Sequence, residues 1–477
     1  MSPISATGPR ADRVSAAKDQ VAEPPHAARR YGAGFWTVAA VFVTAMAFST
    51  VPTPLYPLYQ AQDGFSTFTV TVVFAVYAVG VLTSLLLAGH LSDWLGRKKV
   101  MVSALALELL AAALFLATPS LPVLIVARLV TGLGVGMLTA TATAYLQELH
   151  SAHRPGSSTR RFEIVSTVAN IGGLGLGPIV AGVLAQYLGA PLRLPYVVFV
   201  VLLLTGVAAV VLTPETVRKP EVRPAYRPQR VGSTHGVRGY LEAGAAGFTS
   251  MAVFGLFTSV VPGFVGGTLH HPSRALAGLI VFAVFGAAAV AQTGTGSLGA
   301  RTRWYVGLLA QAVGMALLAI GMHLASLPVF LLAGIIAGAG AGVLFKSAVG
   351  HVAAAAAPAR RGEALAGLFL VSYLGLALLP VGLGIASRSM NVTDATTWFT
   401  AVVLVLLSTV ATRTHRHGPG ASASAGSARP RRDARSQEAR GERGRARGRL
   451  RRAARQDSAL RWLADWPPSP NRTSTKR

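Results

Sequence analysis

Long apolar segments constrain this chain more than any other feature of its sequence. Between residues 35 and 412, apolar stretches of about 18 to 24 residues recur, and each is long enough to cross the roughly 30 Å hydrocarbon core of a bilayer as a helix. Open β-strands cannot span lipid, because their backbone donors and acceptors would lack hydrogen-bond partners there. Charged residues make up 13% of the sequence, against about a quarter in an average soluble protein. The sequence therefore predicts an all-α, multi-pass membrane protein and excludes a secreted or cytosolic one.

Twelve transmembrane helices are expected from the alternation of apolar runs and polar interruptions. Their expected ranges are 35–57, 68–90, 100–117, 121–146, 162–188 and 194–213 in the first half, then 240–262, 275–295, 304–322, 327–349, 364–386 and 396–412 in the second. The polar segment 214–238 separates the two sets of six. No cleavable signal peptide is expected, since about 34 mostly polar residues precede the first span.

Basic residues in the loops predict the orientation of the chain. The loops on one side of the membrane hold 16 Lys and Arg residues, whereas those on the other side hold three, Arg193, Arg274 and Arg388. Short cytoplasmic loops carry an excess of Lys and Arg. Because both termini fall on the side with 16 basic residues, we expect a protein of the inner or plasma membrane with both termini in the cytoplasm.

The net charge of +26 is concentrated at the C-terminus. Residues 413–477 hold 18 Lys and Arg against five Asp and Glu. With few aliphatic residues, this segment cannot bury a core and is expected to be disordered, and no nucleic-acid partner is expected for it. The expected organisation is an N-terminal tail 1–34, a six-helix bundle 35–213, a cytoplasmic loop 214–238, a second six-helix bundle 239–412 and the basic tail 413–477.

An internal repeat relates the two halves. The fourth span reads TGLGVGML at 131–138, and the tenth reads AGAGAGVL at 337–344, an offset of 206 residues. Glycine and proline positions of the fifth span, within 173–182, recur in the eleventh, within 375–384, at an offset of 202. Two such similar offsets predict two pseudo-symmetric six-helix bundles. Repeats of this kind place the substrate site between the halves, near the membrane midplane.

The loop after the second span carries the most specific motif. Residues 89–100 read GHLSDWLGRKKV. This segment resembles the signature loop of the major facilitator superfamily, Gly-x-Leu-x-Asp-x-x-Gly-Arg-Lys/Arg, and the resemblance extends over residues 35–412. It implies the major facilitator fold and a secondary transporter that is not an enzyme. The residues of the expected conformational latch are Gly89, Asp93, Gly96, Arg97 and Lys98.

The chemistry of the latch residues agrees with that resemblance. Gly89 is expected to let a neighbouring helix approach closely, and Gly96 to allow a tight turn. Asp93 is expected to pair with a basic group or with a helix N-terminus. Such a latch would stabilise one of two packings of the halves.

A basic residue lies inside the fourth span. Arg128 is about two turns from the outer end, and glycines follow at 132, 134 and 136, as in the second motif of the same superfamily. An unpaired charge at this depth costs at least a few kcal/mol. Arg128 is therefore expected to face the interior of the bundle, and snorkelling to the outer interface is the alternative.

The fifth span resembles the motif of the drug/proton antiporter branch of this superfamily. The residues that carry this resemblance are Gly173, Gly177, Pro178 and Gly182. The usual motif has a glycine pair after Gly-Pro, whereas here Ala181 replaces the first glycine of that pair. Pro178 is expected to kink the helix, because it removes a backbone hydrogen bond. The resemblance implies proton-coupled antiport, and a purely structural kink is the alternative.

One acidic residue is expected deep in the membrane. Glu108 lies nine residues into the third span, whereas the other acids of the twelve-span region lie at span ends or in loops. A charged carboxylate at that depth is costly, so Glu108 is expected to be protonated part of the time or paired. We expect Glu108 to carry a proton and Arg128 to adjust its protonation; a purely structural Glu is the alternative. For Glu148, Glu163 and Glu363, structural pairing with nearby arginines is expected.

Several classes of chemistry lack residues to support them. The chain has no cysteine, which excludes disulfides and thiolate metal sites. It has no Gly-Lys-Ser/Thr loop to hold phosphates, and its histidines lack metal-ligand spacing, so no cofactor, no metal and no ATP-driven transport are expected. Lys346, the one lysine within a span, is expected to snorkel towards the cytoplasmic interface.

Proton-coupled export of small amphipathic compounds, including drugs, is the function these features favour. The expected partners are a small-molecule substrate, protons and the lipid bilayer, with a monomer favoured as the oligomeric state. Import of a metabolite such as a sugar or organic acid is the alternative, and it would require more buried polar residues than the spans provide. A non-transporting membrane sensor that signals through residues 413–477 is a further alternative.

Overall fold

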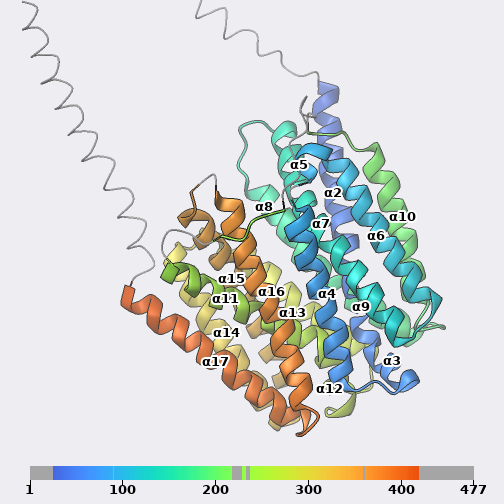
Figure 1. Cartoon of the computed structure of the whole chain (residues 1–477), viewed down its shortest axis with the longest axis vertical. Helices are drawn as coiled ribbons and strands as arrows, with labels where there is room; N and C mark the ends of the chain where they lie inside the picture. Colours follow the sequence, from blue (N-terminus) through green and yellow to red (C-terminus); the bar gives the residue numbers. More distant parts are fainter. Residues whose placement is uncertain (1–24, 90, 218–227, 233–236, 358–359, 418–477) are drawn as a thin grey trace, which may run out of the picture. The chain divides into compact units, whose positions relative to one another are not determined.

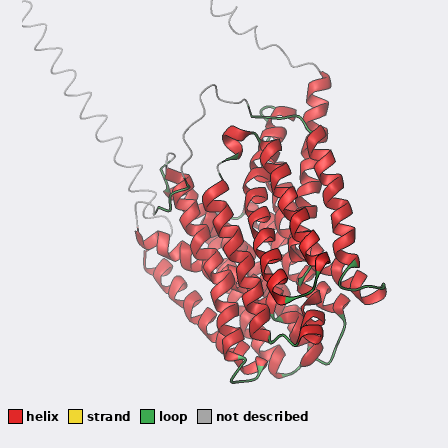
Figure 2. Ribbon diagram, turned by 45° about the vertical axis from the view of Figure 1, so that its right-hand side comes forward, coloured by secondary structure: helices red, strands yellow, loops and turns green. Residues whose placement is uncertain are grey.

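The computed structural model describes residues 25–89, 91–217, 228–232, 237–357 and 360–417. Within these ranges every regular element is a helix (Figure 2). Twelve of the helices are long and apolar enough to cross a membrane. The expected tails 1–34 and 413–477 and the expected loop 214–238 lie largely outside the described residues.

Six membrane-spanning helices form the first half of the chain (Figure 1). They are α2 (Pro25–Thr50), α4 (Thr67–Ala88), α6 (Arg97–Ala117), α7 (Leu121–His153), a composite span of α8 (Arg160–Thr167), η2 (Val168–Gly172) and α9 (Gly173–Tyr187), and α10 (Leu194–Leu212). Three short helices lie between them: η1 (Thr53–Leu55), α3 (Tyr56–Asp63) and α5 (Ser92–Leu95).

The second half repeats this pattern. Its spans are α11 (Val237–Ser259), α13 (Arg274–Gly294), α14 (Ala300–His323), α15 (Leu327–Ala355), α16 (Arg361–Ala386) and α17 (Val392–His417), with the short helices α12 (Val261–Gly267) and η3 (Thr295–Ser297). All twelve expected spans are confirmed. Several helices extend beyond the apolar run, as α7 does to His153, because their polar ends continue the helix outside the hydrophobic window.

The internal repeat is visible in how the helices begin. Ser66 caps α4 by accepting a hydrogen bond from the Thr69 N–H at 3.2 Å, and Ser273 caps α13 by accepting one from the Leu276 N–H at 3.2 Å. A serine N-cap satisfies a backbone donor that the first turn leaves unpaired. The two caps are 207 residues apart, close to the offset of 206 between the glycine-rich spans.

Each half is organised around its fourth helix. In the first half α7 contacts α2, α4 and α6, and in the second half α15 contacts α11, α13, α14 and α16. Glycines allow these helix backbones to approach closely, because no side chain separates them. A side chain on Gly132 of α7, for example, would overlap the Tyr77 carbonyl oxygen of α4.

Two pairs of long helices make the most extensive contacts between the halves. α9 contacts α13, and α4 contacts α16. A side chain on Gly278 of α13 would overlap the Pro178 carbonyl oxygen of α9, so the two backbones touch there. The contact surface between the halves is therefore also built on a glycine.

Replacing Gly177 by alanine should destabilise the protein by about 1–3 kcal/mol, the cost of overpacking a filled site. A methyl group there would overlap the Ala47 carbonyl oxygen and the Thr50 hydroxyl of α2. Thermal unfolding of the detergent-solubilised protein measures the effect. Gly286→Ala in α13 is the matched control, because a side chain at Gly286 meets no atom within 4 Å. Equal melting temperatures for the two variants would contradict the close packing of α9 on α2.

Candidate functional site

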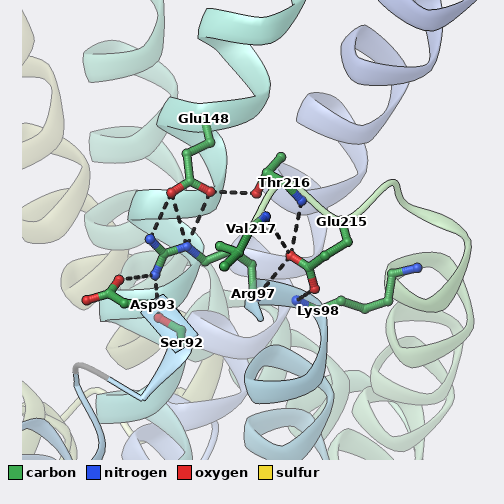
Figure 3. Close-up of polar contacts among 8 residues, drawn as sticks. All are labelled: Ser92, Asp93, Arg97, Lys98, Glu148, Glu215, Thr216 and Val217. Atoms are coloured by element: carbon green, nitrogen blue, oxygen red, sulfur yellow. Dashed lines mark hydrogen bonds and ion pairs between the residues drawn. The ribbon is translucent and has the colours of Figure 1, made fainter. Parts of the chain in front are cut away.

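An arginine at the start of α6 organises the loop between α4 and α6 (Figure 3). Gly96 has a φ of 100°, a left-handed conformation that favours glycine, and it turns the chain from α5 into α6. The Arg97 guanidinium donates to Asp93 Oδ1 at 2.6 Å, to Ser92 Oγ at 2.6 Å and to Glu148 Oε1 at 2.8 Å. Arg97 thus ties α5 and α6 to the end of α7.

A carboxylate from the end of the first half caps α6. Glu215 follows α10 and accepts hydrogen bonds from the backbone N–H groups of Arg97 at 3.0 Å and Lys98 at 3.1 Å (Figure 3). A negative charge at a helix N-terminus is favourable, because the first N–H groups there lack helical partners. Thr216 completes the link by donating to Glu148 Oε2 at 2.5 Å. Among the described residues, all these partners belong to the first half.

The surroundings of two latch residues differ from expectation. The atoms closest to where a side chain on Gly89 would lie belong to Leu85 of its own helix end, so the expected approach of a neighbouring helix at Gly89 is wrong. Lys98 donates its ammonium hydrogen to the Val211 carbonyl oxygen at 2.7 Å. Glu148 forms the expected structural ion pair, but its partner is Arg97, which is distant in sequence, and not the nearby Arg154.

Glu108 and Arg128 are both buried inside the first half. Glu108 of α6 is completely buried, and neither of its carboxylate oxygens has a hydrogen-bond partner among the described residues. Its carboxyl group lies against Gly134 of α7, where any larger residue would collide with it. Arg128 of α7 donates to the Ser49 carbonyl oxygen at 2.6 Å, and no ion pair joins it to Glu108 within the described part of the chain.

Aromatic rings surround the buried arginine. The Arg128 guanidinium carbon lies 4.4 Å from the Tyr77 ring centroid and 5.8 Å from that of Phe74. Cations are attracted to ring faces, and this attraction strengthens away from water. The hydroxyl of Tyr56, also buried, has no hydrogen-bond partner among the described residues. Arg128 therefore faces the bundle interior and does not snorkel; no spacing in the sequence indicates its aromatic partners.

The second half has an uncharged counterpart of Glu108. Gly96 precedes α6 and Gly299 precedes α14, an offset of 203 residues, and the same offset relates Glu108 to Gln311. Gln311 is also fully buried. A side chain on Gly340 of α15 would meet the Gln311 backbone, whereas one on Gly134 of α7 would meet the Glu108 carboxyl group. Its side-chain oxygen accepts a hydrogen bond from Ser250 at 3.5 Å. The equivalent sequence position thus holds a carboxyl group in one half and an amide in the other.

The glycine and proline residues of the fifth span lie where α2, α9 and α13 meet. Gly173 and Gly177 lie against α2, and Gly182 lies against the start of α13 at Arg274. Thr50 of α2 donates to the Leu174 carbonyl oxygen at 2.9 Å. Pro178 lies within α9. The irregular turn of this span lies before Pro178, at the π-helical η2, and π-helical turns are often found at functional positions.

The halves are in contact at the end of the molecule that holds Arg193, Arg274 and Arg388. There the Arg274 backbone N–H donates to Gln186 Oε1 at 3.0 Å, and its guanidinium donates to the Ala185 carbonyl oxygen at 3.0 Å. Arg388, beyond α16, lies with its guanidinium carbon 5.5 Å from the ring centroid of Phe68 in α4. Both contacts join one half to the other. We call this the arginine-poor end, and the opposite one the basic end.

A polar cleft of about 370 Å³ opens between the halves at the basic end. Its residues from the first half are Ser158, Thr159, Arg160, Glu163 and Ile164, and those from the second half are Thr293, Gly294, Gly296, Ser297 and Lys346. The Lys346 ammonium group donates to the Gln292 carbonyl oxygen at 3.2 Å, two residues before the end of α13, so its side chain extends towards the basic end as expected. The molecule is thus closed at the arginine-poor end and has a cleft at the basic end.

Sequence comparison identifies one family. The family model described as the Major Facilitator Superfamily matches residues 37–312. An uncharacterized MFS-type transporter, Rv1250, of Mycobacterium tuberculosis is 29% identical over 154 residues, which are 32% of this chain and 26% of the relative. The putative metabolite transport protein YwtG of Bacillus subtilis is 29% identical over 109 residues, 23% of this chain and 24% of the relative. The match therefore spans about a quarter of the length of each of these curated relatives.

Solved transporter structures share the fold. The human organic anion transporter MFSD10 (TETRAN) aligns with a TM-score of 0.61 and 18% identity, covering 81% of this chain and 100% of the other. The peptide transporter POT in complex with sulfate aligns with a TM-score of 0.67 and 14% identity, covering 81% of this chain and 95% of the other. At these identities the likeness concerns the fold alone.

The Arg97 network generates a prediction about coupling energies. The Arg97 side chain is 9% exposed, and its partner carboxylates are 34% exposed at Glu148 and 62% exposed at Asp93. Arg97→Gln should cost about 1–3 kcal/mol, because it leaves the partly buried Glu148 carboxylate without its charged donor and with Thr216 as its remaining partner. In double-mutant cycles measured by thermal unfolding, Arg97 should couple more strongly to Glu148 than to Asp93, since solvent screens the exposed pair. Equal coupling energies in the cycles with Glu148→Gln and Asp93→Asn would refute this ranking.

Proposed function

Because the chain belongs to the Major Facilitator Superfamily, a family of transporters and not of enzymes, we propose that it exports small amphipathic compounds in exchange for protons. The chain is a multi-pass membrane protein with twelve candidate spans. In this proposal it lies in the inner or plasma membrane, and the basic end with both termini faces the cytoplasm, as the excess of basic residues there favours.

The proposed mechanism is alternating access between the two halves. Contact at the arginine-poor end and a cleft at the basic end are what an inward-facing transporter requires. The two halves would rock about the α9–α13 and α4–α16 contacts, so that closing the basic end opens the other. The latch of Asp93, Gly96, Arg97 and Lys98 would hold the first half rigid during this movement.

Two buried ionisable residues that form no ion pair with each other, Glu108 and Arg128, are the basis for proposing proton coupling. A carboxylate in the surroundings of Glu108 would lack every hydrogen-bond donor, and a proton on either oxygen removes that charge. Arg128 is fixed nearby in the same bundle without an acidic partner among the described residues. We assign proton binding to Glu108, with Arg128 as the charge that makes its deprotonation possible.

The first-half motif around Pro178 supports exchange over simple diffusion. Gly173, Gly177 and Gly182 bring α9 against α2 and α13, so a change near Arg128 in the first half reaches the contact between the halves through α2 and α9. Loosely specified amphipathic substrates suit walls of apolar and aromatic side chains better than sugars do, because sugars need many fixed hydrogen-bond partners.

Glu108→Gln should abolish drug-induced proton movement. In inside-out vesicles energised by respiration, lipophilic drugs added one at a time should collapse the pH gradient with the native protein and not with the variant, since an amide cannot release a proton. Folding should survive, because Gln311 shows that this position of the repeat accepts an amide. Asp63→Asn, an exposed carboxyl group at the end of α3, is the control that should leave the response intact.

The same assay separates the alternatives. Collapse of the gradient by both the native protein and Glu108→Gln would keep the antiporter and remove Glu108 as its proton carrier. No response to a broad panel, with the protein correctly inserted, would favour proton-coupled import of a metabolite instead.

Alternating access predicts opposite behaviour of two cysteine pairs, which can be introduced into the naturally cysteine-free chain. Gln186→Cys with Arg274→Cys joins the halves at the arginine-poor end, and Thr159→Cys with Ser297→Cys faces across the cleft. In the resting protein, a short thiol cross-linker should join the first pair, and only a long one the second. Adding substrate under a proton gradient should slow the first reaction and speed the second. Parallel changes in both pairs would contradict rocking of rigid halves.

A further inference from the structure

The cleft at the basic end has more positive than negative charge. Arg160 contributes from the first half and Lys346 from the second, and the one carboxylate among its lining residues is Glu163. Glu163 already accepts a hydrogen bond from the Thr159 hydroxyl at 2.9 Å. Glu163 lies close enough for its charge to favour that of Lys346, and Arg303, at the start of α14, lies close enough to act against it. Two cations and one anion therefore line the cleft, and a third cation, Arg303, lies near Lys346.

Lys346 is held in a position that an unassisted lysine avoids. It lies nine residues before the end of α15, so a helical rise of about 1.5 Å per residue puts it roughly 13 Å from that end. Its ammonium group has three donors, of which one is used on the Gln292 carbonyl oxygen. No ion pair neutralises it among the described residues. Placing a cation there is costly without an anion to compensate for it.

The other two cations also retain free donors. The Arg160 guanidinium makes no ion pair with any described residue. The Nε of Arg303 is buried and has no hydrogen-bond partner in the described part of the chain. Cations from opposite halves with unused donors can be satisfied together by a carboxylate or phosphate group, which accepts several charge-assisted hydrogen bonds.

We propose that this cleft is an entry site for amphipathic substrates that carry an anionic group, with Lys346 as the principal counter-ion and Arg160 as the second. The volume of about 370 Å³ suits the polar end of a drug-sized molecule. This inference rests on the proposed export function in one respect, the direction in which the bound substrate is transported. It narrows the substrate class from amphipathic compounds in general to amphipathic anions.

The geometry also indicates how such an anion favours transport. An anionic group held between Arg160 and Lys346 attracts the two halves towards each other, because one cation belongs to each half. Closing the basic end would bring both cations to the same anion and remove it from water, where charge-assisted hydrogen bonds strengthen. The substrate thus supplies the second negative charge that balances the two cations lining the cleft.

Binding of a matched pair of probes tests the proposal. Fluorescent 1-pyrenebutyrate and its neutral amide differ only in the charged group, and their affinities can be measured with the full-length protein in phosphatidylcholine nanodiscs. We expect Lys346→Gln to weaken binding of the carboxylate at least tenfold and to leave binding of the amide unchanged. Lys346→Arg should retain most of the affinity. Arg301→Gln is the control, because Arg301 lies at the same end but does not line the cleft.

Three results would overturn the inference. The first is equal loss of affinity for carboxylate and amide, which would indicate a general packing defect. The second is recovery of native transport in the charge-exchanged Glu163→Lys/Lys346→Glu protein, which would make the cleft an ion-pair gate. The third is disappearance of the Lys346 dependence when phosphatidylglycerol is added to the nanodiscs, which would assign the cleft to a lipid headgroup. Because binding is measured without a proton gradient, failure of proton exchange would leave this test intact.

Discussion

Close approach of helix backbones at glycines is the interaction on which the rest of this structure depends. Lipid tails are as apolar as leucine side chains, so no hydrophobic force drives one spanning helix against another, and tight van der Waals contact must replace it. Gly132 provides this contact within the first half, Gly177 between α9 and α2, and Gly278 between the halves. The buried charges are fixed by the same contacts, because Glu108 fits against Gly134 only while that residue lacks a side chain.

Features that depend on local chemistry could be predicted from the sequence. All twelve spans could be found because an apolar run of sufficient length has few alternatives in a membrane, and the turn at Gly96 is specified by its motif. Contacts between distant residues could not be predicted. Arg97 meets Glu148, 51 residues away, and Glu215, 118 residues away, and nothing in the local sequence of any of them specifies the others. Gly89 shows the converse, since its motif suggested a helix contact that the fold does not make.

The charged residues within the first half are arranged differently from those at the cleft between the halves. The Arg97 network joins α5, α6, α7 and the segment after α10, all within the first half, so it can stiffen that half without resisting movement between the halves. The cations of the cleft belong to both halves and outnumber the one carboxylate among its lining residues, Glu163. In the proposed mechanism, the paired charges of the Arg97 network lie within one half, and the excess of positive charge lies at the cleft between the halves.

Comparing equivalent positions of the two halves helps to distinguish residues needed for packing from residues with another role. α7 and α15 share glycines 206 residues apart, such as Gly134 and Gly340, so any role of these helices that is purely structural should be served by equivalent residues in both halves. At the position of Glu108 the second half has Gln311, and at the position of Arg128, 206 residues later, it has Gly334. The fold is therefore compatible with an amide and a glycine in these places. A buried carboxyl group and a buried guanidinium group, each costly in a membrane, persist in one half only, and packing gives no reason for either. The proposed proton binding would give one, because a single half is sufficient to hold one titratable group and one fixed charge.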